Sequence, residues 1–264
     1  MMKYPGYIAR VGWPIISSYW WIRKYAKHPE KYTMEEKYGR LRKLIARVAK
    51  GLNLEIYVKG LDNIPTDGNS FVITPNHLSM IDPFILFMYV STPLSFVGKK
   101  QIIKYPFVGK CMKMLESIFL DRSDLRQNLT MMRTITKTLK ENTHSWVIYP
   151  EGTRTRNEDY SMNEMKPGSF KMALDSGRTI VPVAFFGTFR VLSTKYKNKI
   201  NPIQISFLEP LTAEQFKNMK TLEVASIIQE RVETELNLLR EKDKVLMEEI
   251  ASRKKKKKVR TKRA

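Results

Sequence analysis

The stretch SFVITPNHLSMIDPFILFMYV, from Ser70 to Val90, places a compact apolar run, a polar loop and a second apolar run in succession. The first run, Ser70 to Thr74, has the length and β-branched content of a buried strand. The second run opens at Ile81 and continues as an apolar helix. A strand that passes through a polar loop into a helix predicts one unit of an α/β fold.

Similar short apolar runs recur along the chain, with room for helices between them. They are LEIYVKG (54–60), PLSFVG (93–98), SIFLD (117–121), SWVIYP (145–150) and TIVPVAFFG (179–187). Helical patterns lie at Leu125 to Lys140 and Ser169 to Asp175, and one long apolar stripe runs from Leu222 to Ile250. Strand runs that alternate with helices predict a mixed, largely parallel sheet flanked by helices.

The N-terminal segment combines aromatic and basic residues. Its longest uncharged run, Val11 to Ile22, is too short to span a bilayer, and the segment lacks the small-residue cleavage site of a secretory signal. Trp13, Trp20 and Trp21 lie close to cations, a mixture that suits the headgroup level of a membrane. We therefore expect a helix that lies on a membrane surface, with an amphipathic helix packed on its own domain as the alternative.

A second N-terminal helix, Glu35 to Lys50, is predicted to be amphipathic and basic. The two helices together predict an N-terminal two-helix membrane-associating element in residues 1–51, although a solvated basic face would explain the second helix equally well. The α/β domain then occupies residues 52–250. The remaining residues, 251–264, form a basic tail that cannot pack a core and is expected to be disordered.

The charge of the chain is strongly positive, with 47 Lys and Arg residues against 26 Asp and Glu, a net charge of +21. The segment from Arg253 to Ala264 carries nine cations and no anion, and without it the net charge is still +12. Such an excess suggests a polyanionic partner, which could be nucleic acid, an anionic membrane surface or a phosphorylated substrate. The single cysteine, Cys111, excludes an intramolecular disulfide and fits a reducing compartment.

His77 and Asp82 stand five positions apart around the polar loop. A neutral imidazole can take a proton from a hydroxyl when its tautomer and ring plane are fixed, and a carboxylate at the other ring nitrogen fixes both. The alternative is structural, with Asp82 capping the helix before Pro83 and His77 satisfying a buried carbonyl. The sequence contains no serine nucleophile elbow, no H-E-x-x-H zinc motif and no Walker-type phosphate loop. The available chemistry is therefore general-base activation by histidine, without a metal or a covalent intermediate.

Two further polar loops follow predicted strands, FLDR after the run at 117–121 and EGTRTR after the run at 145–150. In an α/β sheet the carboxyl ends of strands open into crevices, so these loops are expected to meet the loop of His77. Gly152 permits a tight turn, and Arg154 offers a planar fork suited to a phosphate. Arg122 and Lys99 are further cations at predicted strand ends. Together they predict a cationic pocket, with solvent-exposed charges and salt bridges as the alternative.

Four blocks in this order, TPNHLSMID, SIFLDR, YPEGTRTR and TIVPVAF, together with VGKKQIIKYPFVGK, resemble the glycerolipid acyltransferase family, specifically the bacterial 1-acyl-glycerol-3-phosphate acyltransferases. The resemblance covers roughly Leu54 to Leu208. It implies an O-acyltransferase in which His77 is the base and Asp82 orients it. The residues that it implies for binding the phosphate of the acceptor are Lys99, Arg122, Glu151, Gly152, Thr153 and Arg154.

The resemblance also implies the substrates and the setting. The acceptor is lysophosphatidate, the product is phosphatidic acid, and the acyl donor is acyl-CoA or acylated acyl carrier protein, with no cofactor and no metal. Since the acceptor resides in a bilayer, we expect peripheral or monotopic attachment to the cytoplasmic face of the cell membrane. Its anionic surface would then be a further partner.

Two residues depart from the family pattern. Glu116 stands where such enzymes commonly have glycine, and Gln101 stands where a glutamate usually follows the paired lysines. Both leave the base and the phosphate cations intact, so they bear on the preference for acceptor or donor. Acylation of another lysophospholipid or of glycerol 3-phosphate is therefore the closest alternative. A basic nucleic-acid-binding protein is the alternative of another class, and the absence of a known reader motif disfavours it.

Overall fold

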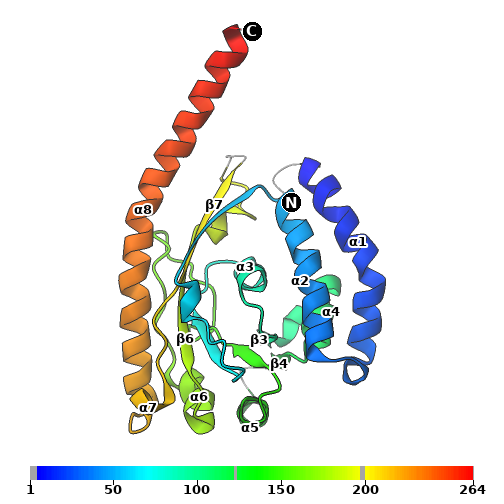
Figure 1. The fold of residues 1–264 in the computed structure, drawn as a ribbon, viewed down its shortest axis with the longest axis vertical. Coiled ribbons are helices and arrows are strands. Elements are labelled where there is room, and N and C mark those ends of the chain that lie inside the picture. The colour runs from blue at the N-terminus through cyan, green and yellow to red at the C-terminus, as the bar shows by residue number, and fades with distance from the viewer. Residues whose placement is uncertain (1–4, 122–123, 197–199, 264) are drawn as a thin grey trace.

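The computed structural model of the 264-residue chain describes residues 5–121, 124–196 and 200–263. Its centre is a seven-stranded sheet in the order β1-β7-β6-β2-β5-β3-β4 (Figure 1). The strands are β1 (Leu54–Lys59), β2 (Val72–Pro75), β3 (Leu94–Lys99), β4 (Ile118–Leu120), β5 (Ser145–Val147), β6 (Ile180–Phe186) and β7 (Asn201–Phe207). All neighbouring strands are parallel except β6 and β7, which confirms the mixed, largely parallel sheet.

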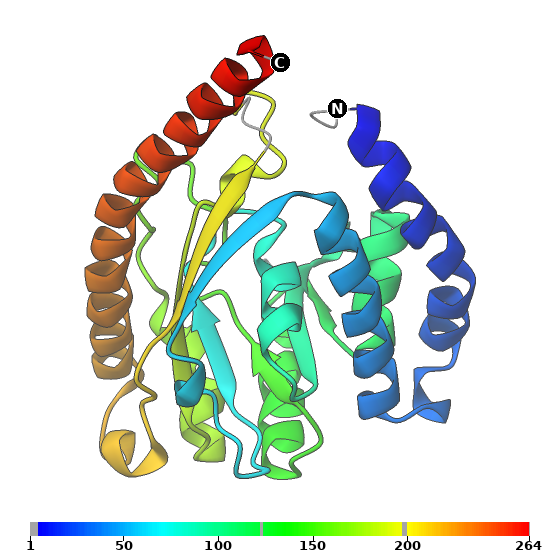
Figure 2. The ribbon, with the colours of Figure 1, turned by 45° about the horizontal axis from the view of Figure 1, so that its top comes forward.

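Helices cover both faces of the sheet (Figures 1 and 2). One layer contains α1 (Pro5–Lys27), α2 (Met34–Gly51), α3 (Asp82–Tyr89) and α4 (Pro106–Met114). The other contains α5 (Leu125–Lys140), α6 (Lys171–Ser176), the short α7 (Ala213–Phe216) and α8 (Thr221–Arg263). Single 3₁₀ turns are η1 (Pro29–Lys31), η2 (Leu61–Asn63), η3 (Lys100–Lys104), η4 (Pro167–Phe170) and η5 (Thr188–Arg190).

Alternation along the strands supplies the two hydrophobic cores. In β2, Ile73 packs in the core shared with α1 to α4, whereas Val72 packs in the core shared with α5, α6 and α8. The same division holds in β6 for Val183 and Ala184. Because side chains of a strand point alternately to opposite faces, a run that is apolar throughout suits a sheet covered on both sides.

Strand β7 was not predicted from the sequence. Its residues Ile203 and Ile205 alternate with polar Gln204 and Ser206, yet all four are buried. The polar side chains face α8: the Gln204 amide donates to the Leu239 carbonyl at 2.8 Å, and the Ser206 hydroxyl donates to Glu235 Oε1 at 2.7 Å. Hydrogen bonds to a distant helix therefore let a half-polar run lie inside the sheet.

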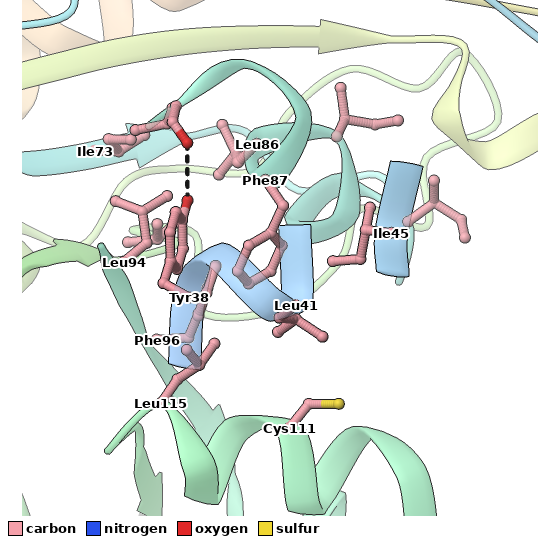
Figure 3. Close-up of a cluster of buried hydrophobic side chains, with 14 of the residues drawn as sticks. Tyr38, Leu41, Ile45, Ile73, Leu86, Phe87, Leu94, Phe96, Cys111 and Leu115 are labelled. Atoms are coloured by element: carbon pink, nitrogen blue, oxygen red, sulfur yellow. Dashed lines mark hydrogen bonds between the residues drawn. The ribbon is translucent and has the colours of Figure 1, made fainter. Parts of the chain in front are cut away.

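The second N-terminal helix, α2, directs its apolar stripe into the core. Tyr38, Leu41 and Ile45 are buried and pack near Phe87 (Figure 3), and the Tyr38 hydroxyl donates to the carbonyl of Val90 at 3.1 Å. The apolar face of α2 therefore contacts its own domain. Only the basic side of this helix is free to meet a membrane surface.

The first helix, α1, has two apolar sides. Ile22, Tyr25 and Ala26 are buried against the domain, whereas Trp13 and Trp20 are 73% and 72% exposed. The helix packs on α2 and α4. Among the described residues, no helix is long and apolar enough to cross a membrane.

Helix α8 differs from its prediction at the C-terminal end. The sequence predicted a helix that ends near Ile250 and a disordered tail, whereas α8 continues to Arg263. Lysine and arginine lose little rotamer freedom in a helix and rank among good helix formers, so a run of them can extend a helix that is already nucleated.

His144, which directly precedes β5, is buried, and burial lowers its pKa to about 4. An unfolded histidine binds a proton near pH 6.5, so the unfolded chain holds one more proton between pH 6.5 and 4. We predict that this histidine alone lowers the free energy of unfolding by roughly 1–2 kcal/mol between pH 6.5 and 5. Urea unfolding at both pH values should show this loss in the native protein and a smaller loss in His144→Gln. An equal loss in both would contradict the assignment.

Candidate active site

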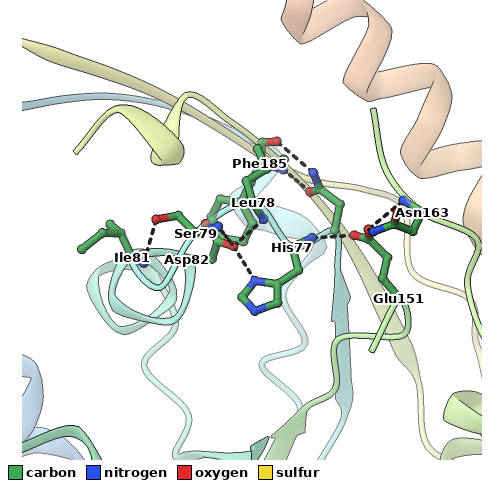
Figure 4. A network of polar contacts seen from close by, with 9 residues as sticks. His77, Leu78, Ser79, Ile81, Asp82, Glu151, Asn163 and Phe185 are labelled. Carbon is green, nitrogen blue, oxygen red and sulfur yellow. Dashed lines mark hydrogen bonds and ion pairs between the residues drawn. The ribbon is translucent and has the colours of Figure 1, made fainter. Parts of the chain in front are cut away.

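The loop that follows β2 brings together the two residues predicted from their spacing. His77 lies in this loop and Asp82 is the first residue of α3. Nδ1 of His77 and Oδ2 of Asp82 are 2.8 Å apart, with the Asp82 side chain fully buried and the His77 side chain 19% exposed (Figure 4). A carboxylate can only accept hydrogen bonds, so Nδ1 carries the proton and Nε2 is left as the proton acceptor.

Asp82 also fixes the loop itself. Its Oδ2 accepts hydrogen bonds from the backbone N–H groups of Leu78 at 2.8 Å and Ser79 at 2.9 Å. The capping alternative is wrong, because the N-cap residue of α3 is Ile81 and no side chain caps this helix; Asp82 instead accepts from the loop that precedes it. The ring of His77 packs on that of Tyr149 with the centroids 4.0 Å apart, and this contact holds the imidazole plane.

Glu151 joins the loop after β2 to a distant point of its own loop, which connects β5 to η4. Its Oε1 accepts from the backbone N–H of His77 at 2.6 Å, and its Oε2 accepts from the backbone and side-chain amides of Asn163 at 2.7 and 2.9 Å (Figure 4). The side chain is buried, and burial raises its pKa. The prediction that Glu151 binds the acceptor stays a prediction, but both of its oxygens already accept hydrogen bonds inside the protein, which favours a role in positioning His77.

Asn76, the neighbour of His77, was missed by the sequence analysis. Its side chain pairs with the backbone of Phe185 in β6, accepting from the N–H at 2.7 Å and donating to the carbonyl at 3.1 Å. The carbonyl of His77 accepts from Thr155 N–H at 2.9 Å. The segment of His77 is thus held from β6 and from the loop after β5, by contacts that no local motif reveals.

A cavity of about 680 Å³ lies in front of His77. The predicted residues Lys99, Gly152, Thr153 and Arg154 line it, and so does Lys166, which the sequence analysis did not single out. Gly152 has φ +73°, a left-handed conformation that favours glycine and turns the loop toward the cavity. Arg122, the remaining predicted cation, lies outside the described residues.

The rest of the cavity wall is apolar. It comes from α2 to α5, and it includes Leu41, Ile45, Phe84, Phe87, Val108, Cys111, Met112, Met131 and Met132. Cys111 is buried, and burial raises the pKa of its thiol to about 12, so it is a wall residue and not a nucleophile at neutral pH. One cavity thus combines the His77 imidazole, cations and an apolar wall large enough to face a hydrocarbon chain.

Of the two departures from the family pattern, Glu116 has a structural partner. It adopts φ +53°, a left-handed conformation in which glycine is less strained, and its carboxylate pairs with the ammonium group of Lys37 in α2. Lys37 is fully buried and also donates to the Pro29 carbonyl at 2.9 Å. Gln101, the second departure, is exposed at the cavity.

Comparison with known proteins identifies relatives of this chain. The acyltransferase family model matches residues 55–186. The 1-acyl-sn-glycerol-3-phosphate acyltransferase of Borreliella burgdorferi is 33% identical over 135 residues, which are 51% of this chain and 52% of that protein. The match therefore spans about half of that relative's length. A probable 1-acyl-sn-glycerol-3-phosphate acyltransferase of Mycoplasma pneumoniae is 24% identical over 80% of this chain and 82% of its own.

A solved structure shows the same fold. The crystal structure of the 1-acyl-sn-glycerophosphate acyltransferase from Thermotoga maritima superposes with a TM-score of 0.66 at 24% identity, over 88% of this chain and 92% of that chain. The structural comparison shows the fold, whereas the match to the family model, over residues 55–186, includes the loops of His77, Asp82 and Glu151. Since it covers half of the sequence, this chain belongs to the acyltransferase family.

Proposed function

We propose that this chain transfers a fatty acyl group from acylated acyl carrier protein or acyl-CoA to the free hydroxyl of 1-acyl-glycerol 3-phosphate, giving phosphatidic acid. The observation that carries the proposal is the His77–Asp82 pair at 2.8 Å, whose second ring nitrogen remains free at a cavity with cations and apolar walls. The names of the relatives in Borreliella and Mycoplasma support the same reaction.

The proposed step uses the two substrates, His77 and Asp82. Nε2 takes the hydroxyl proton of the acceptor while its oxygen attacks the thioester carbonyl carbon. The new C–O bond forms, the C–S bond then breaks, and the imidazolium returns its proton to the departing thiolate. The buried Asp82 carboxylate stabilises the imidazolium between these two proton transfers.

A direct assay tests the reaction. Purified protein in mixed micelles should consume the acyl thioester only when lysophosphatidate is present, and mass spectrometry should identify phosphatidic acid. Parallel reactions with glycerol 3-phosphate and with an uncharged lysolipid compare the alternative acceptors. Thioester consumption that does not depend on any of these hydroxyl acceptors would refute the proposal.

The phosphate of the acceptor is assigned to the cations at the cavity, Arg154 above all. A charge-assisted hydrogen bond to phosphate contributes about 1.5–3 kcal/mol, so Arg154→Ala should raise the acceptor KM roughly tenfold to a hundredfold. The donor KM should barely change. Arg156→Ala is the matched control, because Arg156 is exposed two residues away and does not line the cavity. A rise in donor KM alone would assign the phosphate to other residues.

We also propose attachment to the cytoplasmic face of the membrane through α1. The acceptor is a lipid, so the cavity must exchange substrate with a bilayer. The outward side of α1 offers Trp13, Ile16 and Trp20, each at least 65% exposed, on a helix whose other side is anchored in the core. Indole rings suit the boundary between headgroups and hydrocarbon.

Point substitutions on this side of α1 test the attachment without removing its buried side. Trp13→Ala with Trp20→Ala should weaken binding to anionic liposomes at least tenfold, because each buried aromatic side chain contributes about 1.5–3 kcal/mol. Leu222→Ala with Leu238→Ala, two exposed apolar residues of α8, is the control and should leave flotation unchanged. Full flotation of the tryptophan variant would rule out α1 as the anchor.

A further inference from the structure

Helix α5 carries a basic stripe on its outward face, formed by Arg126, Arg133, Lys137 and Lys140. All four side chains are exposed, and the helix contains no Asp or Glu. At 100° per residue these positions fall within about 60° of arc. The stripe therefore places positive charge on one side of the helix, with one cation in its first turn and three in its second half.

Little negative charge opposes the stripe. Within the part of the chain that the structure describes, Lys137 is the only one of the four with an ion-pair partner, Glu141 at 3.8 Å. Asp124 caps the helix, and its carboxylate accepts from the N–H groups of Arg126 and Gln127. Leu129 is 57% exposed and lies about 20° outside this arc, so the stripe also has one apolar neighbour.

The inner face of the same helix reaches the proposed reaction site. Met131 and Met132 line the cavity of His77, while Ile135 and Leu139 are buried in the core shared with α6 and α8. Helix α1 lies in the helix layer on the other face of the sheet (Figures 1 and 2). A partner on the α5 stripe would therefore leave the tryptophans of α1 free.

We propose that the α5 stripe is the docking surface for a small acidic protein that carries the acyl chain as a thioester. This inference rests on the function proposed above and names the donor. From Arg126 to Lys140 the stripe is about 21 Å long, so it matches the length of an acidic helix. The phosphates of a nucleotide donor would occupy only part of it. Complementary charge over this length favours fast association and selects the partner.

Binding measurements test the docking surface without requiring turnover. Fluorescence anisotropy of labelled bacterial acyl carrier protein in low salt should give a Kd at least tenfold higher for Arg133→Glu with Lys140→Glu than for the native chain. Neither residue lines the cavity. The control is Lys217→Glu with Lys242→Glu, which changes the net charge equally at exposed positions outside α5 and should leave the Kd unchanged.

Kinetics separate the protein partner from a nucleotide. The α5 variant should raise the KM for acylated carrier protein by a similar factor and leave kcat/KM for acyl-CoA of the same chain length unchanged. Equal losses of kcat/KM with both donors would assign the stripe to binding nucleotide phosphates. An unchanged Kd for the carrier protein in the α5 variant would mean that the stripe is a solvated helix face. Either result would overturn the inference. Absence of any acyl transfer by the native chain would refute the proposed function, whereas the Kd comparison would still decide the docking surface.

Discussion

His77→Ala is expected to lower kcat for acyl transfer by about 10²–10⁴-fold, the contribution of a well-placed general base. The ring nitrogen at the cavity is the group that would take the hydroxyl proton, and its partner nitrogen is fixed by Asp82 at 2.8 Å. Asp82→Asn should also be strongly impaired, because an amide can accept from Nδ1–H but no longer stabilises the imidazolium. Initial rates at saturating acceptor and donor measure both effects.

The double variant gives the sharper test, because the effects of two residues that act as one unit are not additive: removing the second adds little to the loss from removing the first. His77→Ala with Asp82→Asn should be little slower than His77→Ala alone. Circular dichroism and thermal unfolding must show that the variants fold, since Asp82 also accepts two backbone hydrogen bonds. His28→Ala, at a half-exposed histidine in the turn before α2, should retain full activity. If His77→Ala kept near-normal turnover, the proposed mechanism would be wrong.

The parts of this site that sequence could predict are those set by local spacing. His77 and Asp82 are five positions apart, across one loop and the first turn of α3, so their contact follows from short-range geometry. The order of strand runs likewise predicted six of the seven strands. Loops that follow parallel strands meet at one edge of the sheet, which is why Arg154 lines the same cavity as His77.

The parts that sequence missed depend on contacts between distant segments. Glu151 lies in a loop whose composition suggested substrate binding. Its two oxygens accept hydrogen bonds from His77 and Asn163, which lie 74 and 12 residues away in the chain. Strand β7 has polar side chains that are satisfied by α8. Lys166 has no motif around it. In each case the structural role of the residue or strand depends on a segment that is distant in the sequence, which supplies either a hydrogen-bond partner or the other residues of the cavity wall.

The pair of Lys37 and Glu116 explains why a glutamate occupies a position with φ +53°. Glycine would relieve the left-handed backbone, yet it would leave the ammonium group of Lys37 buried with the Pro29 carbonyl as its remaining partner. Breaking a fully buried ion pair on one side costs about 3–5 kcal/mol. The Glu116 side chain is 43% exposed, so solvent screens part of the interaction.

Glu116→Gly should therefore lower the free energy of unfolding by about 2–3 kcal/mol, as measured by urea unfolding at pH 7. Lys37→Met with Glu116→Gly should recover native stability or exceed it, because an apolar side chain of similar length replaces the buried charge and glycine suits the backbone. Asn53→Gly is the control for the backbone effect alone, since Asn53 has φ +49° and an uncharged side chain. A double variant as unstable as Glu116→Gly would show that the glutamate acts through something other than Lys37. Recovery would instead establish that this departure from the family pattern acts through Lys37 of α2, the helix that also supplies Leu41 and Ile45 to the cavity wall.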